Sequence, residues 1–132
     1  MVIDSSALVA ILANEPEAGV MAEAMATDPK RLVSSVSVLE TGIVIESRYG
    51  AAGGRELDLL LHRCRMDIVP LTAEQVELAR EAYRRFGKGS HPAGLNLGDC
   101  ATYALSRSTG EPLLFKGNDF SQTDLSLVSY QP

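Results

Sequence analysis

Four acidic residues, far apart in the sequence, stand where a parallel α/β fold gathers functional groups. Asp4 ends a short apolar strand, and Glu40 and Asp99 each lie in the first turn of a predicted helix. Asp119 follows the last main predicted strand. Carboxyl ends of strands and amino ends of helices share one edge of a parallel sheet, so these carboxylates can converge there. A helix end offsets only about 1 kcal/mol of the repulsion, so such a cluster calls for a hard cation, Mg²⁺ or Mn²⁺.

Each acid also has a purely structural interpretation. Taken singly, Glu40 and Asp99 are more often helix caps than ligands, and Asp119 in a Gly-Asn-Asp turn is ordinary turn chemistry. Asp4 is harder to explain this way, because the two serines that follow it could cap the next helix without it. The conjunction of all four positions is what favours a metal site.

The elements that must position these acids alternate between strand and helix. Capping-box patterns at 37–40 and 72–75 open two of the helices, Gly50 is expected to close the first of these, and 53–54 is expected to be a loop. This alternation predicts an α/β fold, a three-layer α/β/α sandwich with a central parallel sheet of four or five strands. The expected strands are 2–3, 31–35, 66–69 and 113–115, with 126–128 as a candidate fifth; the expected helices are 7–13, 16–28, 37–49, 55–64, 72–86 and 96–108.

Length and composition predict a single domain over residues 1–132, with 45% hydrophobic and 22% charged residues. The net charge of −5 argues against a protein that grips nucleic acid by bulk electrostatics, although it allows an approach to phosphate through metal ions and a local basic stripe. No apolar run approaches the roughly 20 residues of a membrane span. The chain opens directly on a core strand and has only two cysteines, Cys64 and Cys100. We therefore expect no signal peptide and a reducing, cytoplasmic location.

The motifs around the acids resemble those of a known family. The opening Asp4-Ser5-Ser6-Ala7-Leu8 resembles the Asp-Thr-Ser-Ala-Leu opening of PIN-domain ribonucleases, and segments 37–40, 96–100 and 113–120 match its later blocks in order and spacing. The resemblance covers essentially the whole chain and is closest to VapC-type toxins of bacterial toxin–antitoxin pairs. It implies a Mg²⁺ site lined by Asp4, Glu40 and Asp99 that cleaves RNA, a homodimer, and a cognate VapB-type antitoxin as partner.

The chain departs from the family pattern at the fourth acid. Many relatives carry an acid two residues before the Asp-Phe pair, and this chain has Gly117 there. Asp119 is then the nearest candidate, with Asp124 as the alternative. Ser6 either hydrogen-bonds the metal-bound water or Asp4, or serves only as a helix cap.

The chemistry that the resemblance implies is hydrolysis of RNA phosphodiesters by a metal-activated water. One or two ions would bridge the acids and the scissile phosphate and would stabilise both ends of the displacement. No histidine is required, which agrees with the positions of His62 and His91, where neither has an evident catalytic partner. The predicted function is a Mg²⁺-dependent endoribonuclease that acts as the toxin of a toxin–antitoxin pair.

Three basic residues are candidates for contact with the RNA backbone. Arg85 and Lys88 lie at the end of one predicted helix and in the glycine-rich loop that leads toward Asp99, and Lys116 is close to Asp119 in sequence. The alternative is a solvated basic face that favours the carboxyl end of the helix.

Two other functions are compatible with these residues. The first is a PIN-like module that binds RNA or protein without cutting it, although the presence of Asp4, Glu40 and Asp99 argues against a degenerate site. The second is a metal-dependent phosphatase, which would need a second Asp where this chain has Ser6.

Overall fold

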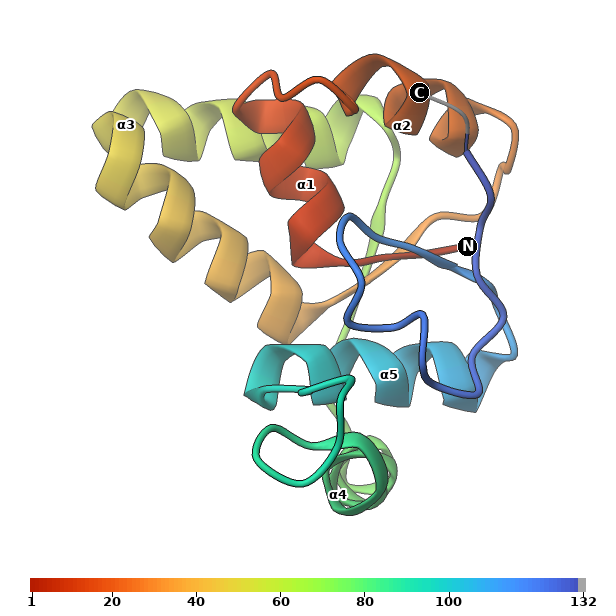
Figure 1. The fold of residues 1–132 in the computed structure, drawn as a ribbon. Coiled ribbons are helices and arrows are strands. Elements are labelled where there is room, and N and C mark those ends of the chain that lie inside the picture. The colour runs from red at the N-terminus through yellow and green to blue at the C-terminus, as the bar shows by residue number, and fades with distance from the viewer. Residues whose placement is uncertain (131–132) are drawn as a thin grey trace.

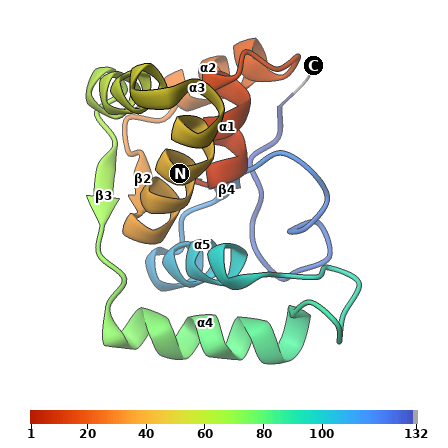
Figure 2. The same ribbon diagram turned by 90° about the vertical axis from the view of Figure 1, so that its left-hand side faces the viewer.

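A parallel sheet between two layers of helices organises the chain. In the computed structural model, which describes residues 1–130, all strand pairs are parallel and the strand order is β3-β2-β1-β4. Figures 1 and 2 show α1, α2 and α3 on one side of the sheet and α4 and α5 on the other. The elements are β1 (Val2–Ile3), α1 (Ser5–Leu12), α2 (Ala18–Ala26), β2 (Leu32–Ser34), α3 (Ser35–Arg63), β3 (Asp67–Val69), α4 (Ala73–Phe86), α5 (Leu97–Thr109) and β4 (Leu113–Leu114). The predicted three-layer α/β/α fold is confirmed.

The sheet separates two hydrophobic cores. Successive side chains of a strand point to opposite faces, so Val2 packs into the core beneath α4 and α5 while Ile3 packs into the core beneath α1, α2 and α3. Leu113 and Leu114 of β4 divide in the same way. The central strands are therefore covered on both faces, and each of them ends at the same edge of the sheet.

Helix α3 confirms the predicted end of a helical segment at Gly50 but has no loop at 53–54. It runs from Ser35 to Arg63 and reverses direction at Gly50, whose φ of 67° and ψ of −159° are non-helical. Gly53, expected in a loop, is helical: the second arm packs so closely on the first that a Cβ there would lie 2.6 Å from the Ile45 side chain. The glycines at 53–54 therefore allow the two helical arms to touch near the turn. Figure 1 shows these arms as the yellow hairpin of α3.

Some of the helix N-caps in the structure differ from those predicted from the sequence. The predicted capping box at 37–40 is wrong, because α3 begins two residues earlier with Ser34 as its N-cap. Asp4 itself caps α1 by accepting the backbone N–H of Ser6, so the serines do not replace it. Thr72 caps α4 as predicted by accepting the backbone N–H of Gln75, but the side-chain oxygen of Gln75 has no hydrogen-bond partner among residues 1–130, so the capping box predicted at 72–75 is only half formed. Asn96 and Asp99 form a complete capping box, which was not among the predicted ones.

The candidate fifth strand is not a regular strand. Segment 126–128 runs beside β4 but makes only one isolated parallel bridge, between Leu113 and Leu127. Backbone hydrogen bonds from Leu113 to Ser126 and from Val128 to Leu113 hold it there. Within residues 1–130, no helix is long and apolar enough to cross a membrane.

Candidate active site

Asp4 lies at the carboxyl end of β1 and is held by hydrogen bonds at both carboxylate oxygens. The hydroxyl of Thr102, on α5, donates to Oδ1 at 2.7 Å, and the backbone N–H of Ser6 donates to Oδ2 at 3.1 Å. The residue is only 3% exposed. A ligand role is compatible with the cap role, since each carboxylate oxygen keeps a lone pair beyond these bonds.

Glu40 reaches the same region from the second turn of α3. The hydroxyl of Ser5 donates to its Oε1 at 2.7 Å. The carboxylate lies against the backbone of Gly98, where a Cβ would be 2.6 Å from Oε1 and 2.7 Å from Oε2. Because Gly98 has no side chain, the carboxylate of Glu40 can contact the backbone at the amino end of α5, next to Asp99 in the sequence.

Asp99 is the most perturbed titratable group of the site. It is 8% exposed, and burial together with the negative charges of Asp4, Asp119 and Glu40 raises the pKa of its carboxyl to about 7. The backbone N–H of Asn96, which donates to Oδ2 at 3.1 Å, opposes this rise in pKa. The negative charges of Asp4 after β1, Glu40 on α3 and Asp119 in the loop after β4 thus act on Asp99, so all four acids lie in one neighbourhood.

Asp119 completes this neighbourhood more loosely. It is exposed in the loop after β4, and partial burial and the charge of Asp4 raise the pKa of its carboxyl. In the conformation described for residues 1–130, no three Asp, Glu, His or Cys side chains form a group that could hold one metal ion. The four acids are therefore neighbours in one electrostatic environment and are not assembled into a closed coordination shell.

Asp124, the alternative fourth acid, is engaged elsewhere. It accepts a 2.7 Å hydrogen bond from the hydroxyl of Tyr103 and forms ion pairs with Arg85 at 3.2 Å and Arg107 at 3.7 Å. These partners lower the pKa of its carboxyl. Asp124 joins the C-terminal loop to α4 and α5, and it is not among the charges that act on Asp99.

The three basic candidates for RNA contact have different environments. Arg85 is committed to Asp124 and Glu81, and Lys116 to Glu15 and Glu17. Lys88 lies exposed in the glycine-rich loop. Its role in RNA contact stays a prediction, and the same role for Arg85 or Lys116 would require these ion pairs to rearrange.

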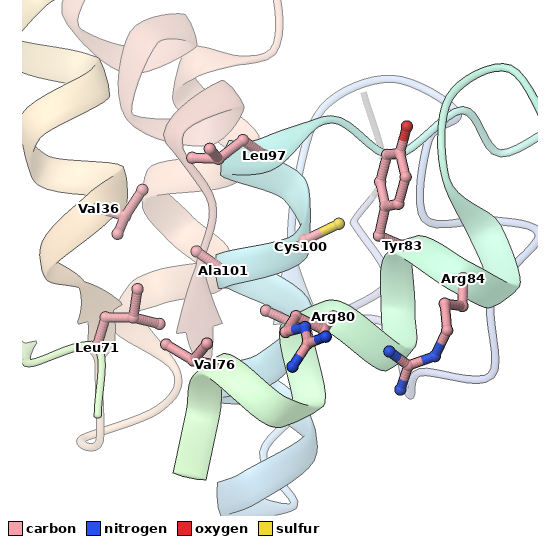
Figure 3. Close-up of a pocket in the computed structure, with 10 residues that line it drawn as sticks. Val36, Leu71, Val76, Arg80, Tyr83, Arg84, Leu97, Cys100 and Ala101 are labelled. Atoms are coloured by element: carbon pink, nitrogen blue, oxygen red, sulfur yellow. The ribbon is translucent and has the colours of Figure 1, made fainter. Parts of the chain in front are cut away.

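A large apolar groove lies away from the acid cluster. The groove of about 650 Å³ is lined mainly by apolar side chains, and Figure 3 shows Val36, Leu71, Val76 and Leu97 around it, with Arg80 on α4 beside them. No carboxylate lines this groove. A smaller cavity of about 420 Å³ includes Glu40 in its lining, which consists of Ser5, Ser6, Val9, Glu15, Glu40, Val44, Arg48, Lys116 and Gly117. Of these two cavities, only the smaller one is lined by one of the four candidate acids, Glu40.

The residues that orient the acids or make room for them were not predicted from the sequence. The sequence indicates Ser5 only as a helix cap, yet its hydroxyl binds Glu40, and Ser6 accepts a backbone hydrogen bond from Lys116 at 2.9 Å. Neither Thr102 nor Gly98 stands out in the sequence. The one available signal is that Thr102 follows Asp99 by three residues, which puts both on neighbouring turns of one helical face.

Comparison with known proteins places this arrangement in a family. Residues 1–125 match the family model of the PIN domain. The chain is 59% identical over 128 residues to a Ribonuclease VapC from Mycolicibacterium smegmatis, covering 97% of this chain and 99% of that protein. It is 55% identical over 129 residues to Ribonuclease VapC30 from Mycobacterium tuberculosis, covering 98% of each.

Solved structures with low sequence identity share the fold. VapC20 from Mycobacterium tuberculosis, described as a Sarcin-Ricin loop cleaving toxin, aligns with a TM-score of 0.78 at 20% identity over 94% of this chain and 95% of that one. VapBC2 from Rickettsia felis, bound to a DNA fragment from its promoter, aligns with a TM-score of 0.76 at 14% identity over 98% of each chain. From the match over residues 1–125 and the identities to its curated relatives, the chain belongs to the PIN-domain family and, within it, to the VapC ribonucleases.

Proposed function

We propose that this protein is a Mg²⁺-dependent endoribonuclease, the toxin of a toxin–antitoxin pair, with its active site at Asp4, Glu40, Asp99 and Asp119. The observation that carries the site assignment is geometric: the carboxylate of Glu40 lies against Gly98, next to Asp99, and Asp4 accepts a hydrogen bond from Thr102 on the same helix as Asp99. Burial and the repulsion of the other three acids, which raise the pKa of Asp99 to about 7, agree with this arrangement. Repulsion among these carboxylates destabilises the folded protein, and helix capping alone does not require it. It is useful where a cation is to be bound.

The donor set fits a hard divalent ion. PIN-domain nucleases of the VapC kind are in general divalent-metal dependent. The site here offers carboxylate oxygens only, which favours Mg²⁺ or Mn²⁺ over softer metals. Asp4, Glu40 and Asp99 are the proposed ligands, and Asp119 is the proposed fourth acid. When bound, such an ion supplies Lewis acidity toward a phosphoryl oxygen and activation of a water molecule.

The chain's own residues prepare this site. Thr102 and the Ser6 amide orient Asp4, and Ser5 orients Glu40, each through an uncharged donor. Among residues 1–130, neither of these two carboxylates forms an ion pair with a lysine or arginine that would offset its negative charge. Because the pKa of Asp99 is raised, a cation that binds this carboxylate competes with a proton for it.

The proposed substrate and partners are those that the relatives' names suggest. The relatives are named ribonucleases, so RNA is the proposed substrate. Two of the structural neighbours are described as a VapBC pair and a toxin–antitoxin complex, so a VapB-type antitoxin is the proposed protein partner. We also propose a homodimer, which sedimentation of the purified chain would test.

The decisive experiment is cleavage of a mixed cellular RNA pool by the purified protein with Mg²⁺, with a chelator, and as Asp99→Asn. Discrete fragments that disappear in both controls are expected. Intact RNA in all three conditions, together with no measurable Mg²⁺ affinity, would instead favour the non-cleaving binding module. Fragments that persist in the chelator would contradict the metal assignment.

A further inference from the structure

Two buried hydroxyl groups form a hydrogen-bonded chain that ends on Asp4. The hydroxyl of Thr102 lies 2.7 Å from Oδ1 of Asp4, and the hydroxyl of Ser37 lies 3.1 Å from that of Thr102. Thr102 and Ser37 have no exposed surface. The chain joins three elements, since Ser37 is on α3, Thr102 is on α5 and Asp4 follows β1.

The chemistry of these groups gives the hydrogen bonds a direction. An ionised carboxylate can only accept, so the single hydroxyl proton of Thr102 must be donated to Asp4. Thr102 then has only lone pairs to offer Ser37, and the hydroxyl of Ser37 must donate to Thr102. We name this chain, Ser37 to Thr102 to Asp4, the hydroxyl relay.

The relay holds Asp4 without neutralising it. One oxygen of the carboxylate is oriented by Thr102 and the other by the backbone N–H of Ser6. An ionised carboxylate has about four acceptor positions, so both oxygens can still accept from or bind another group. No basic side chain forms an ion pair with Asp4 among residues 1–130, so its charge is left to act on its surroundings.

We propose that Thr102 is a positioning residue that sets the affinity of Asp4 for a divalent ion, and that Ser37 acts only through Thr102. This inference rests on the proposed function, because it takes Asp4 as a metal ligand. Hydrogen-bond partners of metal ligands typically change metal affinity by roughly 10–100-fold when they are removed. Thr102→Val keeps the shape of the side chain and removes the donor, so it is expected to weaken Mn²⁺ binding by about this factor.

Calorimetric titration of the full-length protein with Mn²⁺ tests the relay directly and does not depend on RNA cleavage. Thr102→Ser keeps the donor and should retain the wild-type affinity. Ser37→Ala should cause a smaller loss than Thr102→Val, because it removes only the bond that orients the Thr102 hydroxyl. In the Thr102→Val background, Ser37→Ala should cause no further loss.

Thr41→Val is the matched control. Thr41 is as buried as Thr102, but its hydroxyl donates to the backbone carbonyl of Ser37 in its own helix, at 2.7 Å, and not toward an acid. Its Mn²⁺ affinity should equal that of the wild type, with circular dichroism showing that each variant is folded at the titration temperature. If Thr102→Val does not fold, the comparison of Ser37→Ala with Thr41→Val decides the question.

Three outcomes would overturn the relay. The first is that Thr102→Val binds Mn²⁺ as tightly as the wild type; if Thr102→Val does not fold, the same result for Ser37→Ala counts instead. The second is that Thr41→Val loses as much Mn²⁺ affinity as Thr102→Val. The third is that Ser37→Ala lowers the Mn²⁺ affinity further in the Thr102→Val background. Failure of the proposed function looks different: the wild type itself would then bind neither Mn²⁺ nor Mg²⁺, and the relay would fall together with the metal site.

Discussion

At the scale of single residues, the charge state of Asp99 is the central property of the site. Burial and three neighbouring acids raise the pKa of its carboxyl from an ordinary value of 3.8 to about 7. The unfolded chain therefore releases this proton at lower pH than the folded chain does. The free energy of unfolding contributed by this group is highest below about pH 4, falls as the pH rises from about 4 to 7, and is constant above that.

Asp99→Asn should accordingly stabilise the metal-free protein at pH 8. A tenfold change in the proton affinity of a carboxyl corresponds to about 1.4 kcal/mol, so a gain on the order of 1–4 kcal/mol in the free energy of unfolding is expected. Asparagine can still accept the backbone hydrogen bond of Asn96, so the helix cap survives. Urea denaturation at pH 8 and at pH 4 measures the effect, and a gain that is equal at both pH values would contradict its electrostatic origin.

At the scale of the elements, glycines decide how closely the helices approach one another and the acids. Gly98 lets the carboxylate of Glu40 lie on the amino end of α5, where a Cβ would approach both carboxylate oxygens within 2.7 Å. Gly50 has a φ of 67° and reverses α3, which brings its two arms into contact. Neither role is visible in helix propensity, which only disfavours glycine.

Gly98→Ala should reduce RNA cleavage at least about tenfold, because it displaces Glu40, a proposed metal ligand, and displacing a ligand commonly has effects of this size. Stability should be unchanged or slightly higher, because Glu40 is a flexible side chain that can move and alanine favours a helix by about 0.5–1 kcal/mol. Gly42→Ala is the matched control, since its Cβ would make only an ordinary contact at 3.7 Å with Leu57. Equal activity of both variants would show that the position of Glu40 is not limiting.

Gly50→Ala should destabilise the fold by about 1–3 kcal/mol, because a side chain is strained at this backbone conformation. Gly19→Ala in α2, where a Cβ would meet nothing within 4 Å and φ is not positive, should be neutral or stabilising. Thermal denaturation of the two variants separates the effect of the α3 turn from a general effect of alanine.

At the scale of the whole molecule, the site is assembled from segments that span nearly the entire chain. Asp4 and Asp119 lie near opposite ends of the sequence, yet the charge of each affects Asp99. The ion pairs of Asp124 with Arg85 and Arg107 attach the loop that carries Asp119 to α4 and α5. A bound cation would therefore stabilise the fold as a whole.

Mn²⁺ should raise the melting temperature, and the increase should depend on pH. A ligand at 100 times its dissociation constant stabilises the folded state by about 2.7 kcal/mol. Because Asp99 must lose a proton to bind, the stabilisation should grow as the pH rises toward about 7 and level off above it. Melting curves between about pH 5.5 and 8, with Mn²⁺ and with chelator, measure this. An increase that does not change with pH would exclude Asp99 as a ligand.

The amino-acid sequence by itself determined the α/β alternation, the three-layer fold, the family, and the four acids that the structure brings into one electrostatic environment. These properties depend on local patterns: an apolar strand that ends in Asp4, Asp99 in the first turn of a predicted helix, and hydrophobic periodicity along the helices. The capping box predicted at 37–40 also rested on a local pattern. It is wrong, because Ser34, which precedes this segment, caps α3.

Only the tertiary structure decided what holds the acids and which acid is engaged elsewhere. Thr102 donates to Asp4 across 98 positions, and Ser5 to Glu40 across 35. Asp124 pairs with basic side chains on two helices, which its turn-like sequence context gave no reason to expect. The pairing of residues so far apart depends on how the layers pack, because periodicity places a residue on a face but does not identify the side chain opposite it.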